Sequence, residues 1–276
     1  MRESRSITAL RHIVLLTFVV ISLYPALNVF TISLRPGDQL RSTDLSIIPQ
    51  GWSLESYRQL FTNQPFMRWL GNSLIVATGV TITGVVLASI GGYAFSRFRF
   101  VGRKATMLAI LTTQMFPATM LLLPLYIVIA RLQLINTYLG LMVFYTSTAL
   151  PFCVWQMKGF YDTIPVSLEE AARIDGCSRA MAFWRVILPL AVPGLVITAL
   201  FSFMAAWSEY IVAAQVMQDE EMFTLPLGLK SFQASLSTQW GLYAAASILV
   251  SLPVVIVFLM LSKFLVSGLT LGSVKE

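Results

Sequence analysis

Apolar residues in this 276-residue chain fall into long runs that are separated by short polar segments. A helix that crosses a bilayer needs about 20 residues of mainly apolar character. Prolines inside several of the runs are tolerated in membrane bundles, where they produce kinks. We therefore expect an all-α membrane protein. The pattern predicts six spanning helices, at about 13–34, 70–95, 106–130, 139–158, 190–213 and 242–266.

The composition supports a membrane protein. The chain is 57% hydrophobic and 12% charged, with a mean hydropathy of +0.76, whereas a soluble domain carries about 25% charged residues. Much of the surface must therefore face lipid. The first run is longer than the apolar region of a cleaved signal peptide, about 7–15 residues, and it ends without a small-residue cleavage site, so we expect it to remain as a span.

The distribution of Lys and Arg predicts the orientation. With the N-terminus inside, most of the 19 basic residues lie in cytoplasmic segments, as the positive-inside rule requires. Both termini are then cytoplasmic, and the net charge of +6 reflects orientation rather than binding to nucleic acid. The predicted parts are the N-terminus with the first span (1–35), an extracytoplasmic segment (36–69), a transmembrane domain (70–266) with a cytoplasmic loop (159–189), and a cytoplasmic tail (267–276).

The extracytoplasmic segment contains the sequence WSLESYRQLF, which predicts a short helix with Ser53 as its N-cap. Aromatic residues mark the boundary between membrane and water in many membrane proteins. Trp52, Tyr57 and Trp69 therefore predict an interfacial helix with aromatic anchors.

No set of residues for catalysis or cofactor binding is visible in the sequence. The dipeptide Gly-Lys is absent, which excludes a P-loop for ATP. His12 is the single histidine, so neither a Ser/His/Asp set nor a metal site with Cys153 and Cys177 can be assembled. We expect no enzyme activity, no metal and no cofactor in this chain.

Glu209 is the only carboxylate inside the predicted spans. An ionisable group at membrane depth indicates a functional position. Two interpretations remain open: Glu209 lines a substrate pathway, or it pairs at the outer interface or with another helix, since it lies near the end of its span. Other candidate pathway residues, which also suit helix packing, are Gln114, Tyr145 and Trp207.

The segment 167–189, SLEEAARIDGCSRAMAFWRVILP, is unlike its surroundings. Burying its six charges in the bilayer centre would cost about 18 kcal/mol on the insertion scale, so the segment lies outside the hydrocarbon. Ser167 followed by Glu170 forms a capping box that predicts a helix start. Gly176 fits the left-handed position after a helix, and Ser178 predicts the cap of a second short helix.

The predicted helix, glycine turn and helix carry a small apolar face. Ala171, Ala172 and Ile174 are too small to form a core, but such a face suits insertion into a groove of another protein. A solvated connector is the alternative, and the residues by themselves leave both open.

The cytoplasmic loop resembles the EAA loop of ATP-binding-cassette importer permeases. The resemblance rests on Glu170-Ala171-Ala172, on Gly176 and on the sequence VILP at 186–189, although the family has Ile where this chain has Val186. The resemblance extends from about residue 50 to the end of the chain. The stretches YAFSR (93–97), QMFPA (114–118) and GLTLGSVK (268–275) are similar to the maltose-type permeases of the carbohydrate branch.

This resemblance implies the type I importer fold and a multi-pass place in the inner membrane. It implies alternating access driven by a homodimeric cytoplasmic ATPase that binds ATP and magnesium, with a second homologous permease and an extracytoplasmic sugar-binding protein as further partners. The implied substrate is a maltose-, maltodextrin- or trehalose-like sugar. A glycerol phosphate permease is the alternative, and an ion-coupled secondary transporter is the more distant one.

The resemblance also implies roles for three sets of residues. The set that couples to the ATPase is Glu169, Glu170, Ala171, Ala172, Asp175 and Gly176. The tail that contacts the ATPase is Thr270, Leu271, Gly272, Ser273, Val274 and Lys275. The loop that faces the binding protein contains Phe232, Gln233, Ser235, Ser237 and Gln239.

Overall fold

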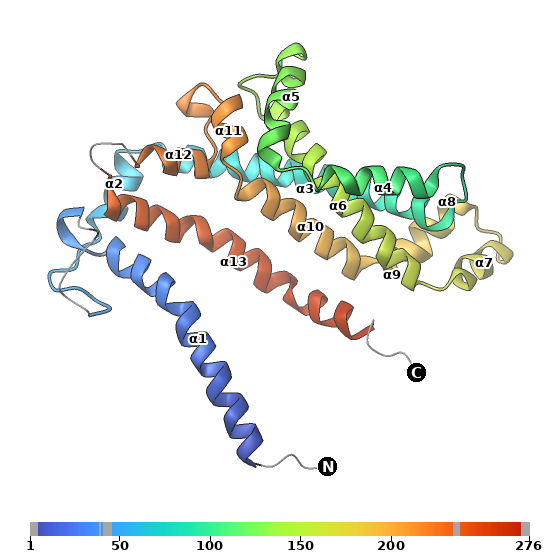
Figure 1. The fold of residues 1–276 in the computed structure, drawn as a ribbon, viewed down its shortest axis with the longest axis horizontal. Coiled ribbons are helices and arrows are strands. Elements are labelled where there is room, and N and C mark those ends of the chain that lie inside the picture. The colour runs from blue at the N-terminus through green and yellow to red at the C-terminus, as the bar shows by residue number, and fades with distance from the viewer. Residues whose placement is uncertain (1–4, 39, 41–45, 234–237, 272–276) are drawn as a thin grey trace. The chain divides into compact units, whose positions relative to one another are not determined.

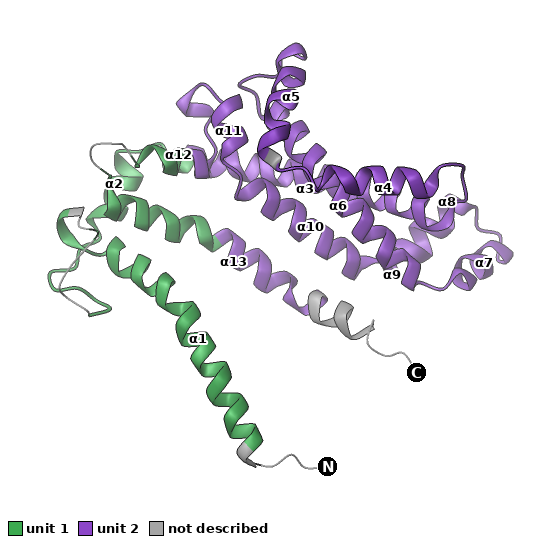
Figure 2. Cartoon of the chain, in the orientation of Figure 1, with its two compact units in different colours: residues 1–67, 228–252 green, residues 68–227, 253–276 purple. Residues whose placement is uncertain are grey.

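The structure, a computed structural model, describes residues 5–38, 40, 46–233 and 238–271. These residues fold almost entirely into helices, and within them the only β structure is one isolated bridge between Gln233 and Thr238 (Figure 1). The chain divides into two compact units, residues 1–67 with 228–252 and residues 68–227 with 253–276 (Figure 2).

In the first unit, the end of the N-terminal helix contacts the segment that is predicted to be extracytoplasmic. The Ser33 and Tyr57 hydroxyls lie 2.9 Å apart, and the Ser53 amide donates to the Leu34 carbonyl at 3.0 Å. The Ser53 hydroxyl accepts from the Glu55 amide at 3.0 Å, as a capping side chain does. Helix α2 itself begins at Glu55, so its N-cap residue is Leu54, one residue after the predicted position. The unit contains α1 (Arg5–Ser33), η1 (Pro36–Asp38), α2 (Glu55–Thr62) and parts of α12 (Leu225–Ser231) and α13 (Trp240–Leu271).

The second unit contains most of the helices. One continuous helical stretch runs from Arg179 to Leu190, and its central turn, η2 (Phe183–Ile187), is π-helical. The other elements are α3 (Phe66–Arg97), α4 (Arg103–Thr113), α5 (Ala118–Arg131), α6 (Tyr138–Thr163), α7 (Val166–Ile174), α8 (Arg179–Ala182), α9 (Leu188–Leu190), α10 (Val192–Trp207), α11 (Ile211–Val216) and η3 (Glu220–Met222).

Four of the described helices, α1, α3, α6 and α13, are long and apolar enough to cross a membrane. The helical stretch Arg179–Leu190 and helix α10 meet at an angle of 77°. If this bent pair counts as one span, it is the fifth candidate span among the described helices. The third predicted span is divided into α4 and α5. The break lies at Pro117, which is the N-cap of α5 with φ −55° and ψ 131°. Proline has no amide hydrogen to donate to a preceding helical carbonyl, so it interrupts the helix at this point.

The predicted fifth span ends earlier than residue 213. Helix α10 ends at Trp207, and after a short break α11 begins at Ile211. The carboxylate of Glu209 accepts hydrogen bonds from the first amides of α11, including that of Ile211 at 2.8 Å. A side-chain acceptor of this kind favours a new helix start over continuation of the old helix.

Trp69 was expected at the membrane surface, and this prediction is wrong. Its side chain is fully buried, and its indole nitrogen donates to the Glu220 carbonyl at 3.0 Å. Asn72, one turn further along α3, donates to the carbonyls of Glu221 and Phe223, both at 2.8 Å. The start of α3 is thus enclosed by the segment that follows α11.

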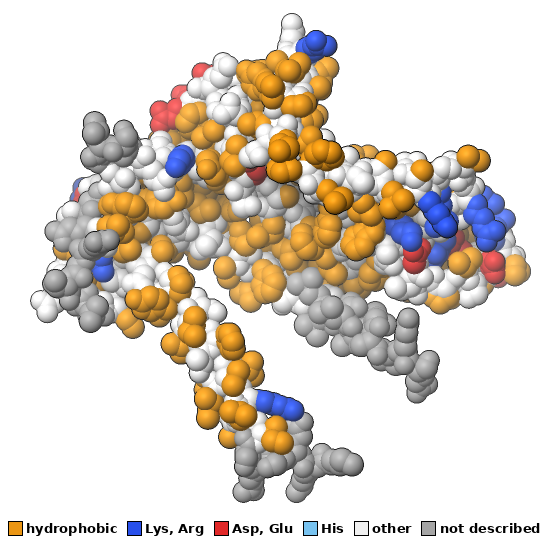
Figure 3. Space-filling model, viewed as in Figure 1, with side chains coloured by type: hydrophobic (Ala, Val, Ile, Leu, Met, Phe, Trp, Pro, Cys, Tyr) orange, Lys and Arg blue, Asp and Glu red, His pale blue; other side chains and the backbone are white. Residues whose placement is uncertain are grey.

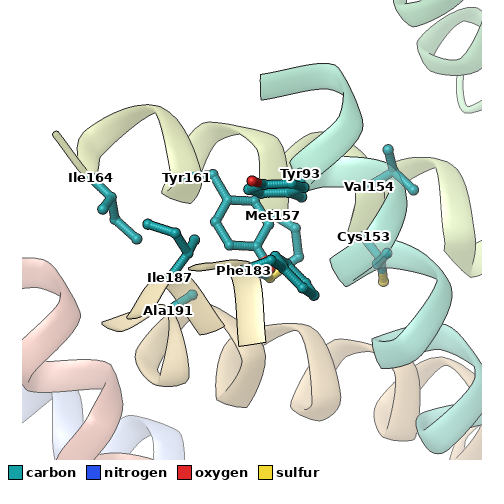
Figure 4. Close-up of a cluster of buried hydrophobic side chains, with 10 residues drawn as sticks. Tyr93, Cys153, Val154, Met157, Tyr161, Ile164, Phe183, Ile187 and Ala191 are labelled. Atoms are coloured by element: carbon teal, nitrogen blue, oxygen red, sulfur yellow. The ribbon is translucent and has the colours of Figure 1, made fainter. Parts of the chain in front are cut away.

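The core of the second unit near the α7–α8 segment lies between α3, α6 and η2 (Figure 4). The rings of Tyr93 and Phe183 have centroids 4.6 Å apart, and the hydroxyls of Tyr161 and Ser89 lie 2.9 Å apart. Burial of this cluster fixes the end of α3 against the end of α6. Its members are Ala88, Tyr93, Cys153, Val154, Met157, Tyr161, Ile164, Phe183, Ile187 and Ala191.

Gly92 allows α3 and α6 to approach closely. A Cβ atom at this position would lie 2.7 Å from Cβ of Met157 and 2.9 Å from the amide nitrogen of Lys158. We expect Gly92→Ala to lower the free energy of unfolding by about 1–3 kcal/mol, as overpacking does, because neither neighbour is the end of a flexible side chain. Thermal unfolding in detergent measures the effect, with Gly159→Ala as the control because open space surrounds that position. Equal midpoints for the two variants would contradict the close contact.

Candidate functional site

Helix α7 begins earlier than the capping box predicts. Its first residue is Val166 and its N-cap is Pro165, with no side-chain hydrogen bond at the cap. The Pro165 carbonyl accepts from the Leu168 amide at 3.3 Å, so Ser167 lies inside the first turn. The predicted capping box is therefore wrong. Proline has a fixed φ that suits a helix start, and here it takes the place of the serine cap.

The turn after α7 confirms the prediction for Gly176. Its φ is +88°, in the left-handed region. The Gly176 amide donates to the Arg173 carbonyl at 3.1 Å, and the Cys177 amide donates to the Ala172 carbonyl at 2.9 Å. These are the two bonds of a Schellman motif. The Ser178 hydroxyl then accepts from the Met181 amide at 3.2 Å and caps α8, as predicted.

Glu169 points away from solvent toward the end of α3. One of its carboxylate oxygens accepts from Nε of Arg97 at 2.5 Å, and the other accepts from the Tyr93 hydroxyl at 3.0 Å. The side chains of Arg97 and Glu169 are only 8% and 12% exposed. Partial burial strengthens the attraction between the two charges, so this ion pair fixes α7 to α3.

Arg97 also connects α3 to α6. Its guanidinium donates to the Ile164 carbonyl at 2.7 Å and to the Ser96 hydroxyl at 3.1 Å. The Ser96 hydroxyl donates to Asp162 at 2.7 Å, and Asp162 forms an ion pair with Lys158 one turn earlier on α6. One polar network therefore holds the ends of α3, α6 and α7 together.

The outer side of α7 is solvent-exposed and of mixed character. Glu170, Ala171 and Asp175 are exposed, and Ile174 is 86% exposed at the end of the helix. Ala172 is buried, so the predicted exposed face of Ala171, Ala172 and Ile174 is wrong at this position. Two of the six predicted coupling residues, Glu169 and Ala172, therefore face the interior. The other four are exposed: Glu170, Ala171, Asp175 and Gly176.

A basic cleft lies between the end of α3 and the α7–α8 segment. Its volume is about 310 Å³. The Arg179 guanidinium lies over the Phe98 ring at 5.9 Å from its centroid. Figure 3 shows basic side chains gathered at the end of the second unit where α4 begins and α7 and α8 lie. The charged residues that line the cleft are Arg97, Arg99, Arg173, Arg179, Glu169 and Glu170.

Sequence reasoning assigned no role to Tyr93 and Arg97, although both belong to the stretch that resembles the family. The available signal was a basic residue that ends a long apolar helix. Such a residue is usually an interfacial anchor, so its partner, 72 positions away at Glu169, was not predictable.

The four candidate pathway residues do not form one group. The Tyr145 hydroxyl donates to Glu209 at 2.9 Å, so this pair joins α6 to the start of α11 and favours the helix-pairing interpretation of Glu209. Trp207 is buried and stacks on Phe203 at 5.3 Å. The Gln114 side chain donates to the carbonyl of Thr148 at 2.9 Å.

The predicted loop and tail are described in part. Phe232 is buried, Gln233 accepts from Lys230 at 2.7 Å, and Gln239 is exposed. Thr270 and Leu271 lie in the last turn of α13. Among the described residues there is no group of three or more His, Cys, Asp or Glu that could hold a metal ion. The predicted residues outside the described part are Ser235, Ser237, Gly272, Ser273, Val274 and Lys275.

Comparison with known proteins agrees with this arrangement. The chain is 35% identical to the diacetylchitobiose uptake system permease protein DasC of Streptomyces coelicolor, over 91% of each chain. It is 37% identical to the maltose/maltodextrin transport system permease protein MalG of Escherichia coli, over 96% of this chain and 94% of that protein. A chain of a bacterial ABC transporter involved in the import of the acidic polysaccharide alginate has the same fold, with a TM-score of 0.82 and 23% identity over 96% of this chain and 99% of that one.

The family resemblance is therefore confirmed across nearly the whole chain. Its relatives are permease components of transporters rather than enzymes, and its apolar helices agree with a place in the inner membrane. The sequence profile of the matching family covers residues 79–270. This chain belongs to the family of binding-protein-dependent transport system inner membrane components.

Proposed function

We propose that the chain is a membrane-spanning permease subunit of an ATP-driven importer for oligosaccharides. The observation that carries the proposal is the largely buried Arg97–Glu169 ion pair, which fixes the exposed helix α7 to a long apolar helix. A force applied to α7 from outside this chain would reach the end of α3 directly. The coupling surface comprises the exposed residues Glu170, Ala171, Ile174 and Asp175, with Gly176 at the turn.

The force comes from a homodimeric cytoplasmic ATPase that binds ATP and magnesium. ATP-driven closure of that dimer pulls α7 inward together with the coupling helix of a second, homologous permease, and the spans open outward. Six spans place both termini in the cytoplasm, with α4 and α5 forming one broken span. The end of α13 and the residues after it then reach the ATPase.

An extracytoplasmic binding protein delivers the sugar, and the segment 232–239 faces it. Relatives that are named for diacetylchitobiose and maltodextrin uptake support an oligosaccharide as the substrate class. A glycerol phosphate is the alternative small solute. An ion-coupled mechanism would need an available carboxylate in the spans, but Glu209 is engaged by Tyr145 and by the start of α11.

Sugar-dependent ATP hydrolysis tests this function. The chain is reconstituted with its partner permease, ATPase and binding protein, and hydrolysis is measured with mono-, di- and oligosaccharides and with glycerol 3-phosphate. We expect severalfold stimulation by an oligosaccharide, and only when the binding protein is present. Uptake by this chain alone, driven by an ion gradient, would contradict the proposal, and stimulation only by glycerol phosphate would replace the substrate class.

A further inference from the structure

A groove beside the start of α4 combines basic and apolar side chains and is distinct from the cleft at α7. Its volume is about 450 Å³. It is formed by the last residues of α3, the first turns of α4 and the end of α6. The lining residues are Phe95, Arg103, Lys104, Met107, Leu108 and Lys158.

The helical spacing of α4 arranges the groove into a charged end and an apolar end. Residues four apart lie on the same side of a helix, so Arg103 precedes Met107, and Lys104 precedes Leu108, along one face. Leu108 is 63% exposed. The cations lie in the first turn of α4, whereas the apolar pair lies one turn further along the helix.

The charged end has an excess of positive charge. Lys158 pairs with Asp162, which also accepts from the Ser96 hydroxyl at 2.7 Å. Arg103 donates to the Ser96 carbonyl at 3.4 Å and interacts electrostatically with Asp162. Neither Arg103 nor Lys104 forms a direct ion pair with any residue that the structure describes, so the three cations exceed the one carboxylate. No side chain caps the start of α4, where the N-cap is glycine. The Arg103 amide donates to the Phe100 carbonyl at 3.3 Å, and the positive end of the helix adds to the attraction for an anion.

We propose that this groove binds an anionic phospholipid. The phosphate lies against Arg103, Lys104 and Lys158, and an acyl chain follows Met107 and Leu108 along α4. Basic pockets between spanning helices on the cytoplasmic side recognise such headgroups. The exposed apolar half distinguishes a lipid from a free phosphate, and the unpaired cations distinguish an anionic lipid from a zwitterionic one.

Lipid retention by the purified full-length chain tests the proposal. The protein is mixed in nonionic detergent with equal amounts of phosphatidylglycerol and phosphatidylethanolamine, and bound lipids are counted by native mass spectrometry. We expect the wild type to retain phosphatidylglycerol preferentially. The double variant Arg103→Gln/Lys104→Gln should retain about 25-fold less, since each cation near a headgroup contributes about fivefold.

The control is Arg131→Gln, which removes an exposed cation at the far end of α5 and should keep the wild-type preference. Thermal unfolding of both variants checks that the fold is unchanged. The wild type alone tests the preference for phosphatidylglycerol over phosphatidylethanolamine, whatever the variants do. Three results would overturn the proposal: equal retention of both lipids by the wild type, displacement of phosphatidylglycerol by excess inorganic phosphate, or normal retention of phosphatidylglycerol by the double variant.

Discussion

Replacing Arg97 with Met is expected to lower the free energy of unfolding by about 3–5 kcal/mol. The substitution leaves the nearly buried Glu169 carboxylate without its cation, and an uncompensated buried charge costs this much. It also removes the hydrogen bond from the guanidinium to the Ile164 carbonyl. Thermal unfolding of the detergent-purified chain measures the loss as a lower midpoint.

Two further variants make this test specific. Arg99→Gln removes an exposed arginine two positions away and should leave the midpoint nearly unchanged. Adding Glu169→Gln to Arg97→Met removes both charges while keeping an acceptor for the Tyr93 hydroxyl, so most of the stability should return. If Arg97→Met unfolds at the same temperature as Arg99→Gln, the ion pair does not hold α7.

Replacing Gly176 with Pro is expected to abolish transport while leaving membrane insertion intact. The residue has a φ of +88°, whereas proline requires a φ of about −65°. Proline also lacks the amide that donates to the Arg173 carbonyl. The turn must therefore open, and the exposed Ile174 and Asp175 lose the orientation on which the proposed docking of an ATPase depends.

The matched control is Gly176→Asn, because asparagine tolerates the left-handed region and keeps the amide. We expect this variant to retain most of the transport rate and to co-purify with the ATPase. The measurement is sugar uptake into proteoliposomes, with co-purification scored in parallel. Normal uptake by Gly176→Pro would show that the geometry of this turn does not contribute to coupling.

Local signals predicted much of the fold. The long apolar runs located the helices, and the glycine turn and the Ser178 cap were correct because each depends on residues only a few positions apart. The predicted start of α7 was wrong because two local signals for a helix start lie close together there. The helix begins after Pro165, whose φ is fixed, and the hydroxyl of Ser167 does not cap it.

Long-range contacts account for the remaining errors. Trp69 has the sequence context of an interfacial residue, but a segment about 150 positions later encloses it and supplies the Glu220 carbonyl. Glu169 was assigned to the coupling set together with Glu170, and only the tertiary approach of Arg97 shows that it faces inward. A pattern within one segment carries no information about such partners.

The π-helical turn Phe183–Ile187 lies within the helical stretch that connects α8 to α9. A π-turn holds one more residue than the corresponding α-helical turn. Removing that residue would restore an even helix and leave the residues on either side in nearly the same rotational position, because about four α-helical residues complete the same turn. A deletion elsewhere between Arg179 and Leu190 has no extra residue to absorb it, so it would rotate everything before it by about 100° and shift it by about 1.5 Å along the axis. The π-turn is therefore the place in this stretch where the chain can lose one residue without changing the direction in which Ile174 faces.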